Sequence, residues 1–152
     1  MKLISHRGNI SGPNINYENN PDYIVAALKL GYDVEIDVRF FDSFFYLGHD
    51  KRQYKVNHEF LEKKGIWCHA KNFEALEKLQ KLNCIYFWHE NDDYTLTSNG
   101  YIWTFPKKKL LEKSICVLPE KSNYKLIKCY GICSDYIMKY KIMTQDNRKK
   151  IQ

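Results

Sequence analysis

The residues best suited to chemistry are two carboxylates, Glu35 and Asp37, inside the otherwise apolar run "YDVEIDVRFF". Side chains alternate along a strand, so both acids share one face while Val34, Ile36 and Val38 occupy the other. Two carboxylates held so close together repel each other unless they share a proton or face a cation. The pair therefore suits Mg²⁺ or Ca²⁺. Pairing with arginine or lysine from neighbouring strands is the alternative.

Two histidine motifs accompany the acids. "SHRG" places His6 and Arg7 at the end of a first strand, and "LGHD" places His49 beside Asp50 after a hairpin. Imidazole titrates near neutral pH, and the guanidinium fork binds phosphate. Two histidines acting as acid and as base or nucleophile, with a cation and an arginine, suffice to cleave a phosphodiester. The competing interpretation of His6 is a packed core residue, which its neighbours Arg7 and Gly8 disfavour.

The elements that position these residues follow from periodicity and turn signals. Strands alternate with helices, which predicts one α/β domain with a mainly parallel sheet. Residues 91–106 are the exception and indicate strand–turn–strand. The remaining strands are predicted at 2–8, 32–41, 44–50, 66–71, 84–90, 114–120 and 130–137, and the helices at 22–31, 56–65 and 72–83.

Polar groups are predicted to gather at one edge of this sheet, because the carboxyl ends of parallel strands meet there. Four strands deliver them: His6-Arg7, Glu35-Asp37, His69-Lys71 and His89-Glu90.

The most amphipathic helix is predicted over residues 72–83. Asn72 is its expected N-cap, and Phe73, Leu76, Leu79 and Leu82 form its apolar side.

Bulk composition bounds the remaining possibilities. The 152 residues suit one domain, which we place at 1–140, followed by a basic C-terminal tail at 141–152. No apolar run approaches the roughly 18 residues of a membrane span, and His6 and Arg7 interrupt the first apolar stretch, unlike a signal peptide. Five cysteines without a paired spacing indicate a reducing compartment, so we expect a cytoplasmic protein.

The net charge of +6 favours polyanionic partners. A basic nucleic-acid-associated module is therefore an alternative. However, the chain carries no recognisable nucleic-acid motif and its positive residues do not cluster on one element, so we expect no nucleic-acid partner. A solvated lysine-rich surface is the preferred explanation of the charge.

Taken together, "ISHRG…ENN…AALKLGYDVEIDV…YLGHD" resembles the opening of glycerophosphodiester phosphodiesterases and the wider phospholipase-C-like phosphodiesterase superfamily. There the pattern is His-Arg-Gly, Glu-Asn-Thr, Glu-x-Asp and His-Asp. Asn20 replaces the threonine here. The resemblance implies that Glu35 and Asp37 hold a divalent cation, Mg²⁺ or Ca²⁺ with Mn²⁺ as a third candidate. It also implies that His6 and His49 are the catalytic pair and that Arg7 binds phosphate.

Beyond residue 50 the resemblance weakens. The family's Glu-x-Lys strand is matched by "CHAK", which keeps Lys71 for phosphate but has His69 in place of the glutamate. The third metal ligand is then His69, or Glu90 or Asp92 from "WHENDD". Asp135, in "CSD", matches the family's late Thr-Asp.

Two more residues, His89 and Trp103, are expected to line the substrate pocket.

The resemblance implies a (β/α) TIM-type barrel, which needs roughly 200 to 250 residues when complete. We therefore expect a small or incomplete barrel with several outer helices missing. The expected activity is divalent-cation-dependent hydrolysis of a small-molecule phosphodiester, glycerophosphodiester or phospholipid-derived. The alternative within the same fold is a degenerate member that binds a phosphorylated ligand without turnover.

Overall fold

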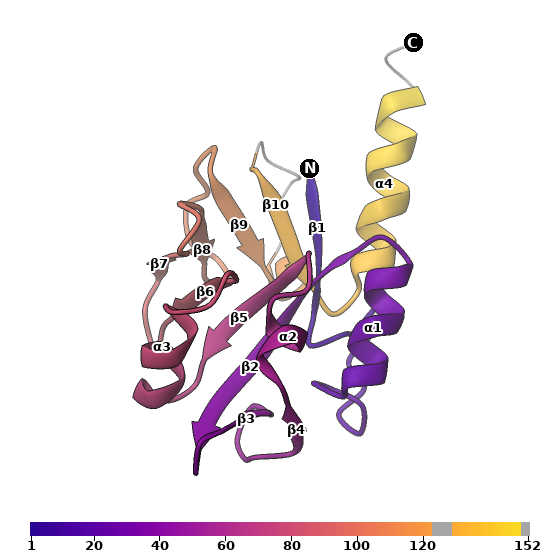
Figure 1. Cartoon of the computed structure of the whole chain (residues 1–152). Helices are drawn as coiled ribbons and strands as arrows, with labels where there is room; N and C mark the ends of the chain where they lie inside the picture. Colours follow the sequence, from indigo (N-terminus) through magenta and orange to yellow (C-terminus); the bar gives the residue numbers. More distant parts are fainter. Residues whose placement is uncertain (123–128, 150–152) are drawn as a thin grey trace.

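The computed structural model describes residues 1–122 and 129–149 and shows a mixed α/β fold with a curled sheet and few helices (Figure 1). Neighbouring strands run parallel along the path β6–β5–β2–β1–β10–β9–β8. The expected mainly parallel sheet is therefore present. The strands of this path are β1 (Lys2–His6), β2 (Asp33–Phe41), β5 (Ile66–Ala70), β6 (Ile85–Trp88), β8 (Ile102–Thr104), β9 (Ser114–Val117) and β10 (Gly131–Ser134).

Three antiparallel strands complete the described sheet: β3 (Phe44–Leu47), β4 (Tyr54–Val56) and β7 (Tyr94–Leu96). The β2–β3 hairpin turns at Asp42 and Ser43, whose positive φ angles of 49° and 68° match the twist of the two strands. The strand–turn–strand prediction for residues 91–106 is confirmed by β7 and β8. Strand β4 was not predicted, because its three residues show no alternation long enough to recognise.

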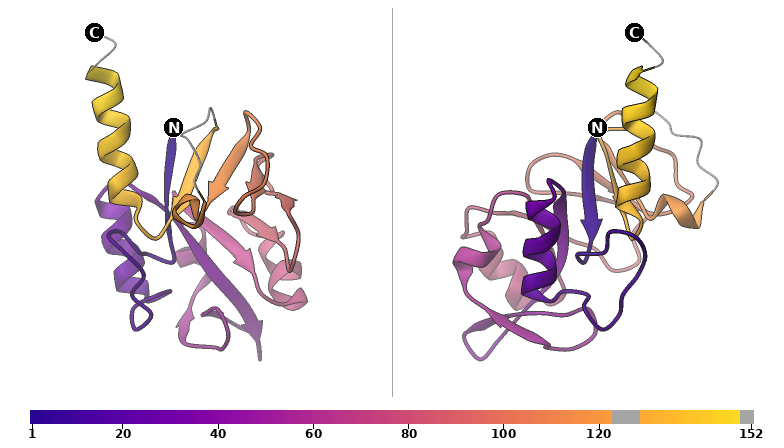
Figure 2. Two further views of the ribbon diagram at one scale, coloured as in Figure 1. Left: turned by 180° about the vertical axis from the view of Figure 1, so that it is seen from behind. Right: turned by 90° about the vertical axis from the view of Figure 1, so that its right-hand side faces the viewer.

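The helices are α1 (Pro21–Lys29), α2 (His58–Leu61), α3 (Phe73–Leu79) and α4 (Ile137–Lys149), with a 3₁₀ turn, η1 (Pro119–Lys121). Asn20 caps α1 by accepting hydrogen bonds from the backbone N–H groups of Asp22 and Tyr23. Asparagine thus supplies a side-chain oxygen to the helix start, as a threonine would. Helix α4 projects past the amino-terminal end of β1 (Figures 1 and 2). No described helix has the length and apolarity needed to cross a bilayer.

Of two expectations for the third helix, the N-cap position of Asn72 is confirmed and the place of Phe73 on the buried apolar side is wrong. Phe73 is 69% exposed, because this short helix turns Ala75 and Leu79 toward the core instead. Asn72 occupies the N-cap position, but its side chain makes no capping bond. Its amide instead accepts from the N–H of Phe40 at 3.0 Å and donates to the Phe40 carbonyl at 2.9 Å. The amide thereby extends the pairing at the edge of β2.

The C-terminal segment expected as a basic tail at 141–152 begins within α4, which runs to Lys149. Residues 150–152 lie outside the described residues.

Alternation divides the apolar residues between the two faces of the sheet. The outer face packs under α1, α2 and α3 through Val34, Ile36 and Val38 of β2 and Ile66, Cys68 and Ala70 of β5. The concave face carries a separate apolar cluster contributed by Ile4, Trp67, Phe87, Trp103, Ile115, Val117, Leu118 and Cys133. The remaining concave positions, toward the carboxyl ends of β1, β2 and β5, are polar.

Candidate functional site

Strand register brings the sequence-predicted acids and histidines together. His6 pairs with Glu35 across β1 and β2, and Asp37 pairs with His69 across β2 and β5. Because each side chain sits at an alternate position facing the concave side, the four converge there. Glu35, Asp37 and His69 are all buried, although each is polar. Such burial needs mutual compensation or a bound ion.

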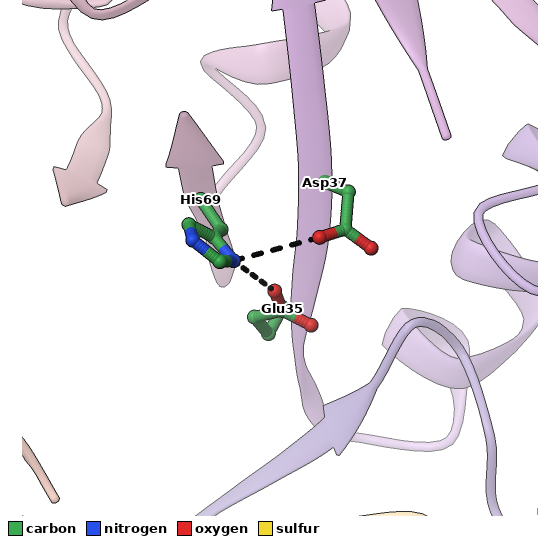
Figure 3. Close-up of side chains that lie close together, drawn as sticks. All are labelled: Glu35, Asp37 and His69. Carbon is green, nitrogen blue, oxygen red and sulfur yellow. Dashed lines mark ion pairs between the residues drawn. The ribbon is translucent and has the colours of Figure 1, made fainter. Parts of the chain in front are cut away.

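The compact core of the site is Glu35, Asp37 and His69 (Figure 3). His69 Nδ1 lies 3.6 Å from Glu35 Oε1 and 3.5 Å from Asp37 Oδ1. One ligand atom from each residue lies within 4.8 Å of the others. His69 Nε2 lies 3.3 Å from the carbonyl oxygen of His89. An Nε2–H donated to this carbonyl leaves the Nδ1 lone pair directed at the carboxylates, as in metal-binding histidines.

The carboxylate oxygens divide into satisfied and unsatisfied atoms. Asp37 Oδ2 accepts from Asn19 Nδ2 at 2.9 Å and pairs with Arg7 Nε at 2.9 Å. Asp37 Oδ1 and Glu35 Oε2 are buried without a hydrogen bond from any described residue. Two orphaned anionic oxygens beside an imidazole nitrogen fit a divalent cation, so Glu35, Asp37 and His69 are the residues that would hold one.

The pKa values show how the cluster is balanced without a metal. Burial alone would raise the pKa of Asp37, but the adjacent His69 ring and the charge of Arg7 hold it well below its usual range. Burial alone would lower the pKa of His69, but Asp37 and Glu35 outweigh burial and raise it. The raised pKa favours the imidazolium form of His69, whose charge would offset part of the carboxylate charge.

His6 is held by a partner far along the chain. Its Nδ1 lies 2.7 Å from Asp135 Oδ1, and its Nε2 lies 3.9 Å from Glu35 Oε2. Asp135 is fixed in turn by Asn9 Nδ2 at 2.8 Å and, through its own backbone N–H, by Glu120 Oε1 at 3.0 Å. Burial opposes protonation of His6, but Asp135 and Glu35 raise its pKa. The arrangement orients Nε2 toward the acid cluster as a proton donor or acceptor.

Arg7 is closely engaged by the protein itself. Its Nη1 donates to Glu18 Oε2 at 3.0 Å, and its Nε pairs with Asp37. The charges of these carboxylates outweigh the effect of burial and raise the pKa of Arg7. Arg7 also lines the cavity, and no described residue accepts a hydrogen bond from its Nη2, so this group can still donate to an anionic ligand.

The other predicted site residues line the same cavity, of about 530 Å³, with these residues. Lys71 Nζ lies 3.9 Å from Asp37 Oδ1. His49 is partly exposed and pairs with Asp50 at 2.7 Å. His89 stacks on His69 with ring centroids 4.4 Å apart, and burial together with the charge of His69 lowers its pKa to about 4. Trp103 contributes to the apolar part of the wall.

The two alternative third ligands lie apart from the acid cluster. Glu90 borders the cavity, and its backbone N–H donates to Asp92. Among the described residues, the group that could share a metal contains His69 and neither of these acids. The geometry thus favours His69.

Four residues of the site were not singled out from sequence: Asn9, Glu18, Asn19 and Glu120. Asn19 clamps Asp37 from both sides, because its Oδ1 also accepts the Asp37 backbone N–H at 2.9 Å. Its φ of 63° is in the left-handed region that asparagine tolerates. The signal for Glu18 and Asn19 was their place in "ENN". No sequence signal pointed to Asn9 or Glu120, since both act on Asp135, which is distant from them in sequence.

Comparisons with protein-family models, curated proteins and solved structures found no match to this chain.

Proposed function

We propose that this chain is a divalent-cation-dependent phosphodiesterase built on an incomplete (β/α) barrel of the phospholipase-C-like type. One observation carries the proposal. A buried Glu35–Asp37–His69 cluster with orphaned oxygens lies beside a histidine held by Asp135, in one cavity that also contains Arg7 and Lys71. Anion-binding cations, an acid–base histidine and a cation site are the parts that phosphodiester cleavage needs.

The chain's own residues divide the work as follows. Arg7 and Lys71 bind and orient the phosphodiester. His6, aligned by Asp135, transfers a proton through Nε2 at the scissile oxygen. His49, at the cavity wall, is the second acid–base or nucleophilic group. A cation bound by Glu35, Asp37 and His69 would supply Lewis-acid stabilisation of phosphoryl charge.

The direct test is hydrolysis of a panel of phosphodiesters, including bis(4-nitrophenyl) phosphate and glycerophosphocholine. The assay is run with Mg²⁺, Ca²⁺ or Mn²⁺ and with a chelator. We expect turnover that the chelator abolishes and that Glu35→Gln and Asp37→Asn both lose. Exposed Glu77, on α3, gives the matched control Glu77→Gln. Turnover that persists in the chelator or in both variants would contradict the cation dependence.

A second candidate is a protein that binds a phosphorylated ligand without turnover. The position of His69 Nδ1 between the two carboxylates favours it, because an imidazolium there can replace the cation. In that case calorimetry should detect binding of glycerol phosphate by the metal-free protein and no binding of Mg²⁺, Ca²⁺ or Mn²⁺.

We also place the protein in the cytoplasm. All five cysteines are free thiols, and none is fully exposed, which suits a reducing compartment.

A further inference from the structure

Exposed apolar side chains lie at the carboxyl end of the sheet, the end at which the cavity also lies. Strands β1, β2, β5 and β8 run parallel to one another along the sheet path, so the segments that follow them lie at the same end. Each of these segments exposes a large apolar side chain: Ile15 after β1 (81%), Phe41 at the end of β2, Phe73 after β5 and Phe105 after β8. Phe44 is also exposed, across the hairpin turn from Phe41. These five exposed residues are called the rim.

Two of these residues connect the rim to the inside of the cavity. Ile15 and Phe105 line it together with Trp103, Val117 and Leu118. The apolar wall of the site is therefore continuous with side chains exposed to solvent. A ligand with an apolar part could pass along this wall without leaving an apolar environment.

Cations accompany the aromatic rings of the hairpin. Lys55 Nζ lies 3.0 Å from the centroid of the Phe44 ring, and Arg52 lies 5.0 Å from that of Phe41. Arg52 also pairs with Asp42 at 3.3 Å, which leaves Lys55 as the stronger positive contribution. The hairpin extends β2 well beyond Asp37, at the end of the sheet opposite the tip of α4 (Figures 1 and 2). It thus presents aromatic and cationic groups together.

We propose that this rim docks on an anionic lipid bilayer, with Phe41 and Phe44 of the β2–β3 hairpin and Lys55 of the adjacent strand β4 as the leading contact. Exposed apolar side chains on separate segments can each enter the interfacial layer of a bilayer, where aromatic rings are favoured. The stacked lysine and the net charge of +6 complement the negative lipid surface. Docking would place the cavity mouth against lipid headgroups. The surface goes beyond the proposed reaction and does not depend on it.

The test is co-sedimentation of the full chain, in a chelator, with vesicles of phosphatidylcholine alone or mixed with phosphatidylserine. We expect binding to the mixed vesicles and much weaker binding to the neutral ones. Phe41→Ser combined with Phe44→Ser should weaken binding by about ten-fold or more. Lys55→Gln should weaken it by about five-fold, and only on the mixed vesicles.

The amino end of the sheet offers matched controls. Leu30 is 54% exposed at the end of α1, and Lys29 is exposed beside it. Leu30→Ser and Lys29→Gln should bind vesicles like wild type. The Leu30, Lys29 and Lys55 variants should keep the wild-type unfolding temperature, since each changed side chain is exposed. Phe41 is only 36% exposed, so the unfolding temperature of the double Phe→Ser variant is measured to show that it is folded at the assay temperature.

Three results would overturn the proposal: no binding to the mixed vesicles, equal binding to both compositions, or an equal loss in Leu30→Ser and the hairpin variant. Light scattering adds a fourth. If wild type is a dimer without lipid and the hairpin variant a monomer, the surface pairs with a second copy instead. His6→Ala should bind vesicles normally, so failure of docking and failure of the reaction are distinguishable.

Discussion

Two layers of side chains on the concave face of the sheet differ sharply although the same strands supply them. Strand β1 contributes Ile4 to one layer and His6 to the other, and β5 contributes Trp67 and His69. The first layer is apolar and the second is ionisable, yet nearly all of both is buried. A step of two residues along a strand thus separates a group that stabilises the fold from one that can do chemistry.

The two layers are stabilised under different conditions. Burial of the apolar layer is favourable at any pH or metal concentration. The polar layer is stable only while its charges compensate one another. Its stability therefore depends on protonation and on bound ions, which makes the comparison testable by substitutions placed in one layer at a time.

The largest expected effect falls on activity in the polar layer. His6→Ala and His49→Ala should each lower kcat/KM by about 10²–10⁴-fold, because a general acid or base contributes that much. The double variant should be little worse than either single one, since both groups serve one transition state. His58→Ala, exposed on α2, is the control and should match wild type. A strong loss in the control with a mild loss in His49→Ala would reverse the assignment.

In the apolar layer, Trp67→Ala should destabilise the fold by about 3–5 kcal/mol through the cavity that it leaves. Its indole also donates to Asp33 Oδ2 at 2.9 Å, and that bond is lost too. Denaturant unfolding measures the loss, and calorimetry should find the metal affinity of the folded fraction unchanged. If metal affinity falls while stability does not, the two layers are not separable.

Protonation of His69 should make cation affinity pH-dependent. Imidazole must be neutral to bind a metal, and the pKa of His69 is raised in the metal-free protein. Affinity should therefore fall as pH drops, from a pH above the ordinary histidine range. The same raised pKa stabilises the metal-free fold at low pH, and this stabilisation is lost as pH rises through the folded-state pKa. Metal-free protein should thus be less stable in mild alkali, and added cation should restore it.

Replacing His69 tests directly whether this residue is a metal ligand. With its nitrogen ligand the site should prefer Mn²⁺ to Ca²⁺, since calcium favours oxygen. His69→Glu should reverse this preference and move the pH dependence into the range where carboxylates titrate. Titration calorimetry with both ions, across pH, checks both effects. If His69→Glu and His69→Ala change neither, His69 is not a ligand and Glu90 or Asp92 becomes the next residue to replace.

The smallest expected effect concerns the support of His6. Asp135→Asn removes a charge that helps to raise the pKa of His6. The limb of the pH–rate profile that reports His6 should move to lower pH, with a smaller loss of activity than in His6→Ala. Glu112→Gln, outside the cavity, is the control. An unchanged profile would mean that Asp135 does not act through His6.

Several features of the fold and the candidate site could be predicted from local sequence. Alternation along residues 32–41 was enough to place Glu35 and Asp37 on one face, and the Asp42–Ser43 turn was evident between two aromatic runs. The predicted apolar side of α3 was only partly correct. Phe73 lies in the first turn of the helix, and helical periodicity does not determine whether other segments cover a side chain there.

The sequence by itself determined which residues alternate and which strands end in polar groups, since these follow from steric preferences within a few residues. Only the tertiary structure decided which groups meet. The contact between His6 and Asp135 spans 129 positions, and the contacts of Asn19 with Asp37 depend on how the loop after β1 returns to β2. Such contacts arise from the register and curl of the whole sheet, because only packing brings distant backbone segments into contact.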